Sequence, residues 1–288
     1  DKKYVQLSVT ENVTFDTHII KNKEKLVFSE IDLDKYITTS TKVEQSSMDA
    51  RLEKIYLDEL ENNIKSIISY QLSKKYGYRE RDYLNPNNFN YIPEKRRQVN
   101  DLLGKMKRQI KDNAVNHTAT KHYINNYGYI PLWVLVKVLS FGIVSELFSI
   151  LKKEDQYDIV ELYDLDVNVF VNYLSSLSNY RNLCAHEDIL YNNRTQKSIL
   201  DTKYHRLLNI PIMDNEYIYG KNDLFSVVIM MKSMIKKDEF DLFEKEISDL
   251  IDELDNKLKS IEINKILDCM GFPKNWKELK DIDKKEIF

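Results

Sequence analysis

Apolar side chains recur at steps of three and four residues along much of this chain, and this spacing constrains its fold more than any other feature. The clearest run begins near Met48 and stops before Gly77, a residue suited to the end of a helix. Its apolar positions are Leu52, Ile55, Tyr56, Leu60, Ile64, Ile67, Ile68 and Leu72. Residues at these steps share one face of an α-helix, so the run predicts a long amphipathic helix with one buried side.

The same spacing predicts further helices over residues 94–112, 132–150, 167–186, 223–235 and 240–267. The chain has only 6 glycines and 5 prolines among 288 residues, which favours helices over a turn-rich sheet protein. The predicted fold class is therefore all-α.

Two of these helices leave a choice of surroundings. Residues 132–150 form the longest apolar stretch, with Pro131 expected in the first turn. Lys137 and Glu146 would be costly at the centre of a bilayer, so we expect a buried core helix and no membrane span. Residues 240–267 keep one apolar strip in register, which favours packing on their own domain and leaves a second subunit as the alternative.

The predicted helices divide the chain into three segments. Residues 1–45 are a segment of uncertain structure, residues 46–267 a helical domain and residues 268–288 a C-terminal tail. A chain of this length can bury a core without disulfides, and its two cysteines form no CxxC pair. A reducing, cytoplasmic location fits this composition best.

The distribution of charge indicates where RNA could bind. The net charge of −3 gives no overall attraction to RNA, so a binding site must be a local patch. The predicted helix at residues 94–112 is the best such patch, although a solvated helix face explains it equally well. Its candidate phosphate contacts are Lys95, Arg96, Arg97, Lys105, Lys107 and Arg108.

A second candidate patch interleaves aromatic and cationic side chains. Tyr76, Tyr78, Arg79, Arg81 and Tyr83 alternate as in proteins that bind single strands, and Arg79 and Arg81 are its candidate RNA contacts. Ordinary surface tyrosines are the simpler alternative.

The residues with the clearest chemistry end the helix predicted at residues 167–186. Arg181 and His186 are separated by four residues, and Asn182 lies between them on one polar arc of the helix. Arg grips phosphate oxygens, and His serves as base or acid near neutral pH, which suits RNA cleavage without a metal. The motif alone is weak, since about half a match is expected by chance, and a satisfied helix-terminal histidine is the alternative for His186.

Other residues have simpler explanations. Glu61 and Lys65 form a helix-stabilising pair by default, with a role in orienting the motif arginine as the less favoured alternative. The apolar neighbours of Cys184 favour packing over nucleophilic chemistry. His117 and His122 lie five residues apart, a spacing that does not put two ligands on one helix face, so we expect no metal and no cofactor.

Several blocks, in order, resemble one protein family. The signature RN-x-x-AH…L-aromatic-N of Abi-like (AbiD/AbiF-type) proteins in the HEPN superfamily resembles Arg181-Asn182-Leu183-Cys184-Ala185-His186 followed by Leu190-Tyr191-Asn192. The family's HY…YG…PLWVLVE…LSFG block resembles residues 121–142, and its early helix resembles residues 49–65, which include Glu61 and Lys65. Residues 222–225 and 270–276 are similar to its later elements.

The resemblance implies a HEPN-type helical bundle with additional N- and C-terminal helical elements. It implies a homodimer in which two Arg/His motifs meet, and a metal-independent endoribonuclease with Arg181, Asn182 and His186 in its catalytic site. The expected role is phage defence by abortive infection, or toxin–antitoxin growth arrest. Some relatives are linked with a small noncoding RNA, so a structured small RNA is an expected partner besides the RNA substrate.

Two acids follow the motif at a place where relatives often carry a basic residue. Glu187 and Asp188 would raise the pKa of His186 and repel RNA, so we expect low or conditional activity. Three functions stay open: an RNA-cleaving enzyme, which is favoured, a catalytically silent RNA-binding protein, and a protein-interaction scaffold in a defence system.

Overall fold

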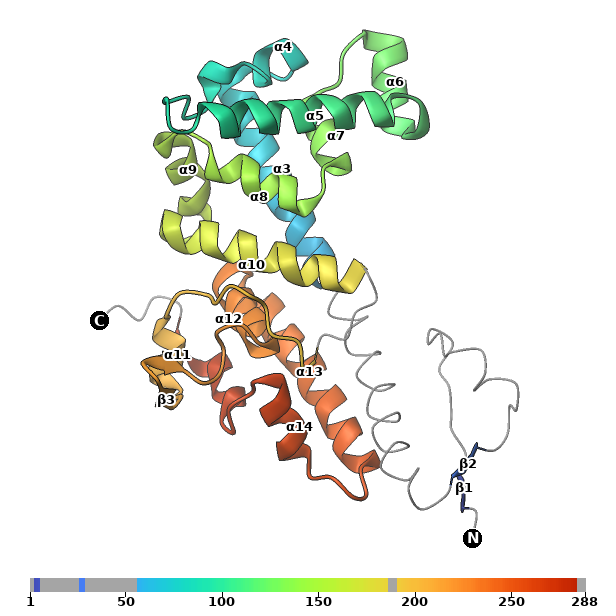
Figure 1. Ribbon diagram of the computed structural model, residues 1–288, viewed down its shortest axis with the longest axis vertical. Coiled ribbons are helices and arrows are strands. Elements are labelled where there is room, and N and C mark those ends of the chain that lie inside the picture. The colour runs from blue at the N-terminus through green and yellow to red at the C-terminus, as the bar shows by residue number, and fades with distance from the viewer. Residues whose placement is uncertain (1–2, 6–25, 29–55, 186–190, 284–288) are drawn as a thin grey trace.

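The computed structural model describes residues 3–5, 26–28, 56–185 and 191–283. Helices make up nearly all the regular structure in this part of the chain (Figure 1). The strands are short and form two antiparallel pairs: β1 (Lys3–Val5) with β2 (Leu26–Phe28), and β3 (Ile212–Met213) with β4 (Glu216–Tyr217). The fold class is all-α, as the sequence predicts.

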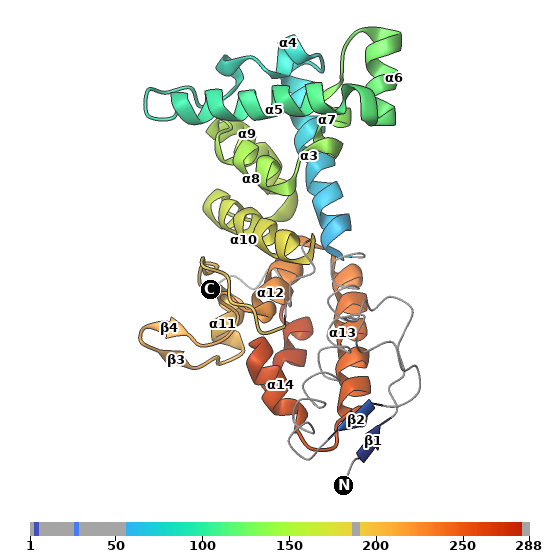
Figure 2. The same cartoon turned by 45° about the vertical axis from the view of Figure 1, so that its right-hand side comes forward.

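The helices are stacked along the long axis of the molecule (Figures 1 and 2). At the top lies α5 (Arg96–Asn116), with α8 (Phe141–Ser149) beneath it, and α10 (Val167–Ala185) crosses the middle. The lower half contains α12 (Leu224–Met234) and α13 (Lys237–Lys257). The other elements are α4 (Glu80–Tyr83), η2 (Pro86–Asn88), α6 (Thr118–Tyr127), α9 (Lys153–Val160), η3 (Glu161–Tyr163), α11 (Lys203–Leu207), α14 (Ile263–Met270) and η4 (Trp276–Asp281).

The helix α3 (Asp58–Tyr76) runs from the top of the molecule to the level of α10 (Figure 2). Its buried side contains Leu60, Ile64, Ile68 and Leu72, which are at most 4% exposed. The N–H of Gly77 closes the helix with a 3.0 Å bond to the Ser73 carbonyl, at φ 98°. The predicted amphipathic helix is thus confirmed from residue 58 onward, and its earlier positions lie outside the described residues.

The apolar stretch predicted as one helix over residues 132–150 is two helices, α7 (Leu132–Val138) and α8. Ser140 lies in the extended region and its Oγ accepts the Ile143 N–H at 3.4 Å, so it starts a new helix. Pro131 precedes the first turn of α7 rather than lying in it. Both helices are largely buried, as expected, and no helix within the described ranges is long and apolar enough to cross a membrane.

The single helix predicted over residues 240–267 is also wrong, because α13 ends at Lys257 and α14 begins at Ile263. The chain turns extended at Leu258, where ψ is 135°. The apolar side of α13 is buried within the chain itself, in agreement with the favoured packing. Its members are Phe240, Phe243, Ile247, Ile251 and Leu254.

The core of the lower half extends past residue 267, where the sequence analysis begins the C-terminal tail. The helix α14 crosses that position, and Trp276 and Leu279 of η4 are at most 2% exposed. Every residue of α12 is buried, so this helix is the centre of the lower half. Its start at Asp223 agrees with the predicted helix at residues 223–235.

Candidate functional site

The predicted catalytic motif lies at the C-terminal end of α10, which is described as far as Ala185. His186, Glu187 and Asp188 lie outside the described residues. Cys184 is only 8% exposed, which agrees with its expected packing role. The geometry of the site is therefore that of Arg181, Asn182 and the groups around them.

A buried tyrosine fixes the rotation of α10. The Tyr180 hydroxyl donates to the Asp223 backbone carbonyl at 2.6 Å and lies 3.2 Å from Ser226 Oγ, at the start of α12. Successive helical residues are turned by about 100°. The next two side chains therefore leave this contact, so Arg181 is partly exposed and Asn182 is exposed.

Arg181 is held by an acid from α3. Its Nε donates to Glu61 Oε2 at 3.2 Å, while Glu61 Oε1 lies 2.5 Å from Lys65 Nζ. The side chains of Glu61 and Lys65 are 7% and 8% exposed, against 38% for Arg181. The Glu61 carboxylate thus lies between two cations, Lys65 and Arg181. Of these three side chains, Arg181 is the one that reaches solvent. The sequence predicts a role for Glu61 and Lys65 in orienting Arg181 only as the less favoured alternative, and the Glu61 contact is of the kind that such a role requires.

Asn182 opens onto a small pocket of about 320 Å³ that the sequence analysis missed. The pocket is lined by Asn179, Asn182 and Leu183 of α10 and by residues 193–196, which follow the motif. Among the latter is Arg194, an exposed cation whose Nη1 donates to the Asn193 carbonyl at 3.3 Å. A phosphate in this pocket would meet both an amide and a guanidinium.

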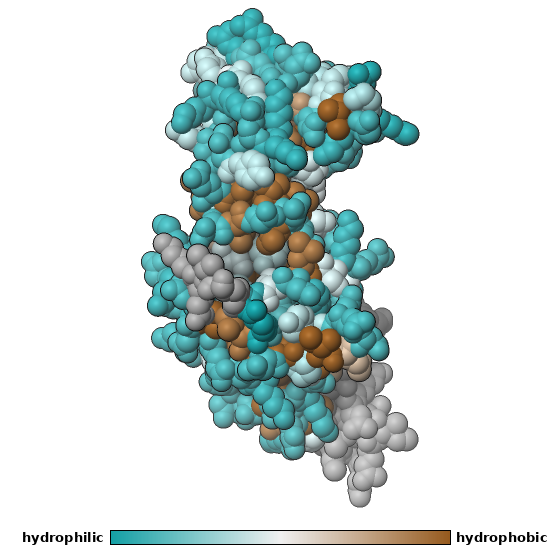
Figure 3. Space-filling model, turned by 90° about the vertical axis from the view of Figure 1, so that its left-hand side faces the viewer, coloured by the Kyte–Doolittle hydropathy of each residue, from teal (hydrophilic) through white to brown (hydrophobic). Residues whose placement is uncertain are grey.

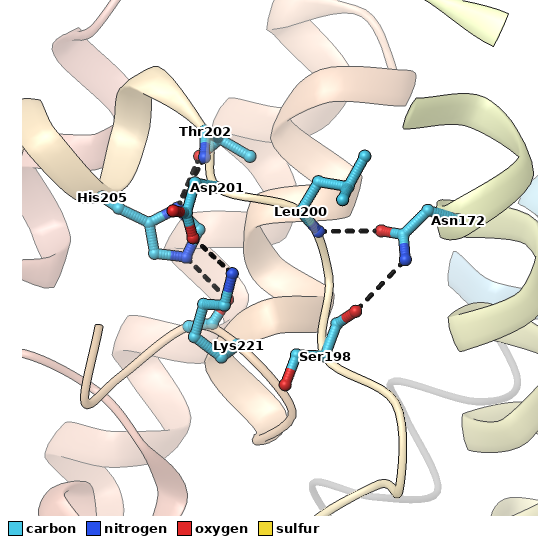
Figure 4. A network of polar contacts seen from close by, with 8 residues as sticks. Asn172, Ser198, Leu200, Asp201, Thr202, His205 and Lys221 are labelled. Atoms are coloured by element: carbon cyan, nitrogen blue, oxygen red, sulfur yellow. Dashed lines mark hydrogen bonds and ion pairs between the residues drawn. The ribbon is translucent and has the colours of Figure 1, made fainter. Parts of the chain in front are cut away.

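The segment that carries Arg194 is fixed to the rest of the protein by amide side chains (Figure 4). Asn172 of α10 donates to the Ser198 carbonyl at 3.1 Å and accepts the Leu200 N–H at 2.9 Å. Nearer to Arg194, the Thr195 N–H donates to the Asn222 carbonyl at 2.8 Å, and Asn222 Nδ2 donates to the Thr195 carbonyl at 3.2 Å. These bonds position Arg194 without involving its own charge.

A buried histidine anchors the far end of the same segment (Figure 4). His205 Nδ1 accepts the Thr202 N–H at 3.0 Å, so Nε2 carries the proton and donates to the Gly220 carbonyl at 2.9 Å. Burial lowers the pKa of His205, so the ring stays neutral. Lys221 and Asp201 form an ion pair beside it. His205 therefore serves the fold and is not a second candidate base.

Arg194 also affects the buried groups at the joint between α10 and α12. Burial raises the pKa of Asp223 to about 7, and the positive charge of Arg194 opposes that rise. Burial also raises the pKa of Tyr180, and the positive charge of Arg194 opposes that rise as well. The only signal for Arg194 in the sequence is its position just after Tyr191 and Asn192, which end the family signature.

The predicted basic helix is α5, which packs on the side of α8 away from α10 (Figure 1). Arg97, Lys105 and Arg108 line a groove of about 570 Å³ together with three acids, Glu94, Asp101 and Glu146. Lys105 Nζ lies 2.6 Å from Glu146 Oε2, and Arg96 lies over the Tyr91 ring at 5.3 Å. Lys107 is exposed. The structure thus separates this helix from the motif and balances part of its charge.

Lys95, the first of these cations, lies in a different groove. This groove of about 730 Å³ contains three lysines: Lys95, which precedes α5, Lys153 of α9, and Lys197 of the segment after the motif. Figure 3 shows the molecule from the left-hand side of Figure 1, where hydrophilic side chains cover the upper part and hydrophobic side chains gather in the middle. No local sequence pattern predicts that Lys95 and Lys197 line the same groove.

The interleaved tyrosines do not lie on one continuous surface. The Tyr83 hydroxyl is buried and donates to the Ile130 carbonyl at 2.9 Å, and the Tyr76 hydroxyl donates to Asp155 at 2.8 Å. Tyr78 is 39% exposed, next to Arg79. Arg81 is exposed and lies 3.6 Å from Asp82. Only part of this stretch is therefore a surface.

No cluster of three or more histidines, cysteines or acids suited to a metal occurs among the described residues. His117 Nδ1 instead caps α6, 2.8 Å from Thr120 Oγ1.

The comparison with protein families identifies a match. The family model for Abi-like proteins matches residues 21–192, a segment that contains Glu61, Lys65, Arg181 and Asn182. No curated protein and no solved structure matches the chain. Since the matched segment covers more than half of the 288 residues, the chain belongs to the Abi-like protein family.

Proposed function

We propose that this protein is a metal-independent endoribonuclease of the HEPN superfamily, of the AbiD/AbiF type, acting in abortive-infection defence against phages. The observation that carries the proposal is the placement of Arg181, whose guanidinium is held by Glu61 at an exposed helix end. Asn182 lies beside it, and Arg194 lines the same pocket as Asn182. Membership of the Abi-like family supports the defensive role.

In this mechanism His186 takes the proton of an RNA 2′-hydroxyl, and the freed oxygen attacks the adjacent phosphorus. Arg181 binds the non-bridging oxygens as negative charge builds on them. Asn182 orients the phosphate with its amide. The bond to the 5′-oxygen then breaks, that oxygen takes a proton from an imidazolium, and the products carry a 2′,3′-cyclic phosphate and a 5′-hydroxyl.

The proposed enzyme is a homodimer. One chain has one Arg181/His186 set, whereas the reaction uses a base and an acid at one phosphate. A two-fold axis near the ends of two α10 helices supplies the second imidazole. The exposure of Arg181 and Asn182 is compatible with such a shared site.

RNA is the proposed substrate and also the proposed regulator. A structured small noncoding RNA would lie on the exposed cations of α5, which α8 separates from the motif, so binding and cleavage use different surfaces. Bound in this way, the RNA restrains a toxic nuclease until infection.

A catalytically silent RNA-binding protein is the second candidate. It is favoured by the same contact, because Arg181 Nε is already occupied by Glu61 and two acids follow His186 in the sequence. A protein-interaction scaffold is the third.

The test is cleavage of end-labelled RNA by the purified protein in EDTA. We expect cyclic phosphate ends, and loss of cleavage in both Arg181→Ala and His186→Ala. Arg206→Ala, an exposed arginine of α11, is the matched control and should cleave normally. Full activity of His186→Ala, or a need for added magnesium, would contradict the proposal. Binding without cleavage by the unchanged protein would favour the silent alternative.

A further inference from the structure

A row of aromatic rings lies at the top of the molecule, where the turn after α3 meets α6 and α7. The ring centroids follow one another at 5.7 Å from Trp133 to Tyr78, 5.6 Å from Tyr78 to Tyr129, 6.3 Å from Tyr129 to Tyr127 and 5.4 Å from Tyr127 to Tyr123. We call these five residues the aromatic row. It joins segments from two parts of the sequence and lies outside the motif region.

The aromatic row faces solvent. Tyr127 is 58% exposed, Trp133 42% and Tyr78 39%. Tyr83, by contrast, is 3% exposed and uses its hydroxyl within the core. Large rings that touch one another yet keep this much exposed area form an apolar patch of the kind that marks a binding surface.

Cations accompany the rings. The guanidinium carbon of Arg79 lies 5.1 Å from the Tyr129 ring centre and 5.9 Å from that of Tyr78. Lys121 and Lys137 are exposed on α6 and α7. The two acids of this turn, Glu80 and Asp82, accept the backbone N–H groups of Ile130 and Arg79. The surface therefore combines π faces with positive charge.

We propose that the aromatic row stacks unpaired bases of RNA, while Arg79 and the neighbouring lysines hold their phosphates. Stacked tyrosines with cations are the chemistry of single-strand binding, because every base offers a π face. A protein partner is the other occupant such rings suit, but positive charge beside the rings favours a polyanion. The inference rests on the proposed RNA-binding function and adds to it a preference for unpaired RNA.

The position of the row sets the length of RNA involved. It adjoins the C-terminal end of α3, whereas Glu61 and Arg181 meet near the N-terminal end of that helix. At 1.5 Å per residue, the helix rises about 22 Å from Glu61 to Tyr76. An RNA strand whose bases stack on the aromatic row therefore reaches Arg181 several nucleotides farther along the strand. The aromatic row thus selects which RNA strand is presented to the cleavage motif.

The two tryptophans allow a direct test. Trp133 is in the row, whereas Trp276 is 2% exposed. The experiment uses the His186→Ala variant, because this substitution prevents cleavage of the RNA. An unpaired 12-nucleotide oligo(U) is added, and the tryptophan fluorescence and the affinity for the RNA are measured. We expect quenching by the unpaired RNA and none by a duplex of equal length, because paired bases offer no free face.

Variants identify the surface. Tyr78→Leu and Tyr127→Leu should each weaken oligo(U) binding about fivefold or more, with the slope of affinity against salt unchanged. Trp133→Phe keeps a ring, so the quenching should vanish while affinity stays within about twofold. Tyr70→Leu, an equally conservative change at a 64% exposed tyrosine of α3, is the control and should bind normally. Circular dichroism confirms that each variant is folded.

The outcomes separate the two proposals. If RNA binds without quenching and both leucine variants bind like the control, the aromatic row has another occupant, such as a protein segment, and this inference is overturned while RNA binding stands. If no RNA binds at all, both this inference and the proposed function fail.

Discussion

Glu61 Oε2 lies 3.2 Å from Nε of Arg181, although the two residues are 120 positions apart in the chain. Because Glu61 is buried and Lys65 lies on its other oxygen, the carboxylate cannot follow Arg181 into solvent. Glu61 therefore holds the Arg181 guanidinium from its buried side and leaves the other side open to solvent.

The first prediction concerns this contact. Glu61→Gln should lower RNA cleavage about tenfold or more with little effect on RNA affinity, since the arginine keeps its charge but loses its orienting partner. Lys65 is left buried without its acid, so the variant should also lose about 3 kcal/mol or more of unfolding free energy.

A double variant separates these effects. Glu61→Gln with Lys65→Met removes both buried charges and should recover much of the stability, measured by urea unfolding, but not the cleavage rate. Glu59→Gln, an exposed acid on the same helix, should change neither. Cleavage that returns together with stability would mean that Glu61 serves only the fold.

The second prediction is the dimer. Light scattering should give about twice the 34.3 kDa mass of the chain. Activity per chain should fall on dilution as dimers dissociate. A monomer that stays fully active at nanomolar concentration would rule out a shared site.

The third prediction concerns the cations of α5. Neutralising Arg96, Lys107 and Arg108 to alanine should cost about 1 kcal/mol or more of binding free energy each and lower the slope of log affinity against log salt by about one unit per lost contact. Lys105→Ala is the matched control on the same helix. Its charge is already paired with Glu146 at 2.6 Å, so its effect should be smaller. Equal effects of all four changes would show that the pairing does not matter.

The fourth prediction concerns pH. The unfolded chain loses the proton of Asp223 near the ordinary pKa of 3.8, whereas burial raises the pKa in the folded protein to about 7. Between these values the unfolded state binds fewer protons at Asp223, so the contribution of Asp223 to the free energy of unfolding should fall as pH rises from about 4 to 7. The contribution is at most about 4 kcal/mol.

Asp223→Asn isolates this effect. The amide keeps one oxygen for the Ser226 N–H at the start of α12. Urea unfolding of both proteins at pH 4.5 and 7.5 should show a smaller pH dependence in the variant. Identical curves would mean that Asp223 titrates at its ordinary pKa.

Local sequence signals predicted the helices well and their breaks poorly. Apolar spacing and Gly77 located α3 and its end, because both depend on neighbouring residues only. The same spacing continues across Ser140 and Leu258, where the backbone turns extended, so periodicity joined helices that the structure separates.

The candidate site was predictable only in part. The motif identified Arg181 and Asn182 because their types and spacing carry chemistry. Arg194 lies in the pocket because bonds to Asn222 and Asn172 fold its segment back onto α10, and no local pattern encodes those bonds. Likewise, Tyr83 turns inward and Tyr78 outward although both belong to one interleaved stretch.

The hydrogen bond from the Tyr180 hydroxyl to the Asp223 carbonyl joins the segment that matches the family model to a part of the chain that lies outside it. The family match ends at residue 192, so α11 to α14 lie outside it. The contact of Arg181 with Glu61, by contrast, lies wholly within the matched segment. If α12 and its neighbours were replaced by another domain, the Tyr180 hydroxyl would need a new hydrogen-bond acceptor. A buried hydroxyl without an acceptor would lower the stability of the protein.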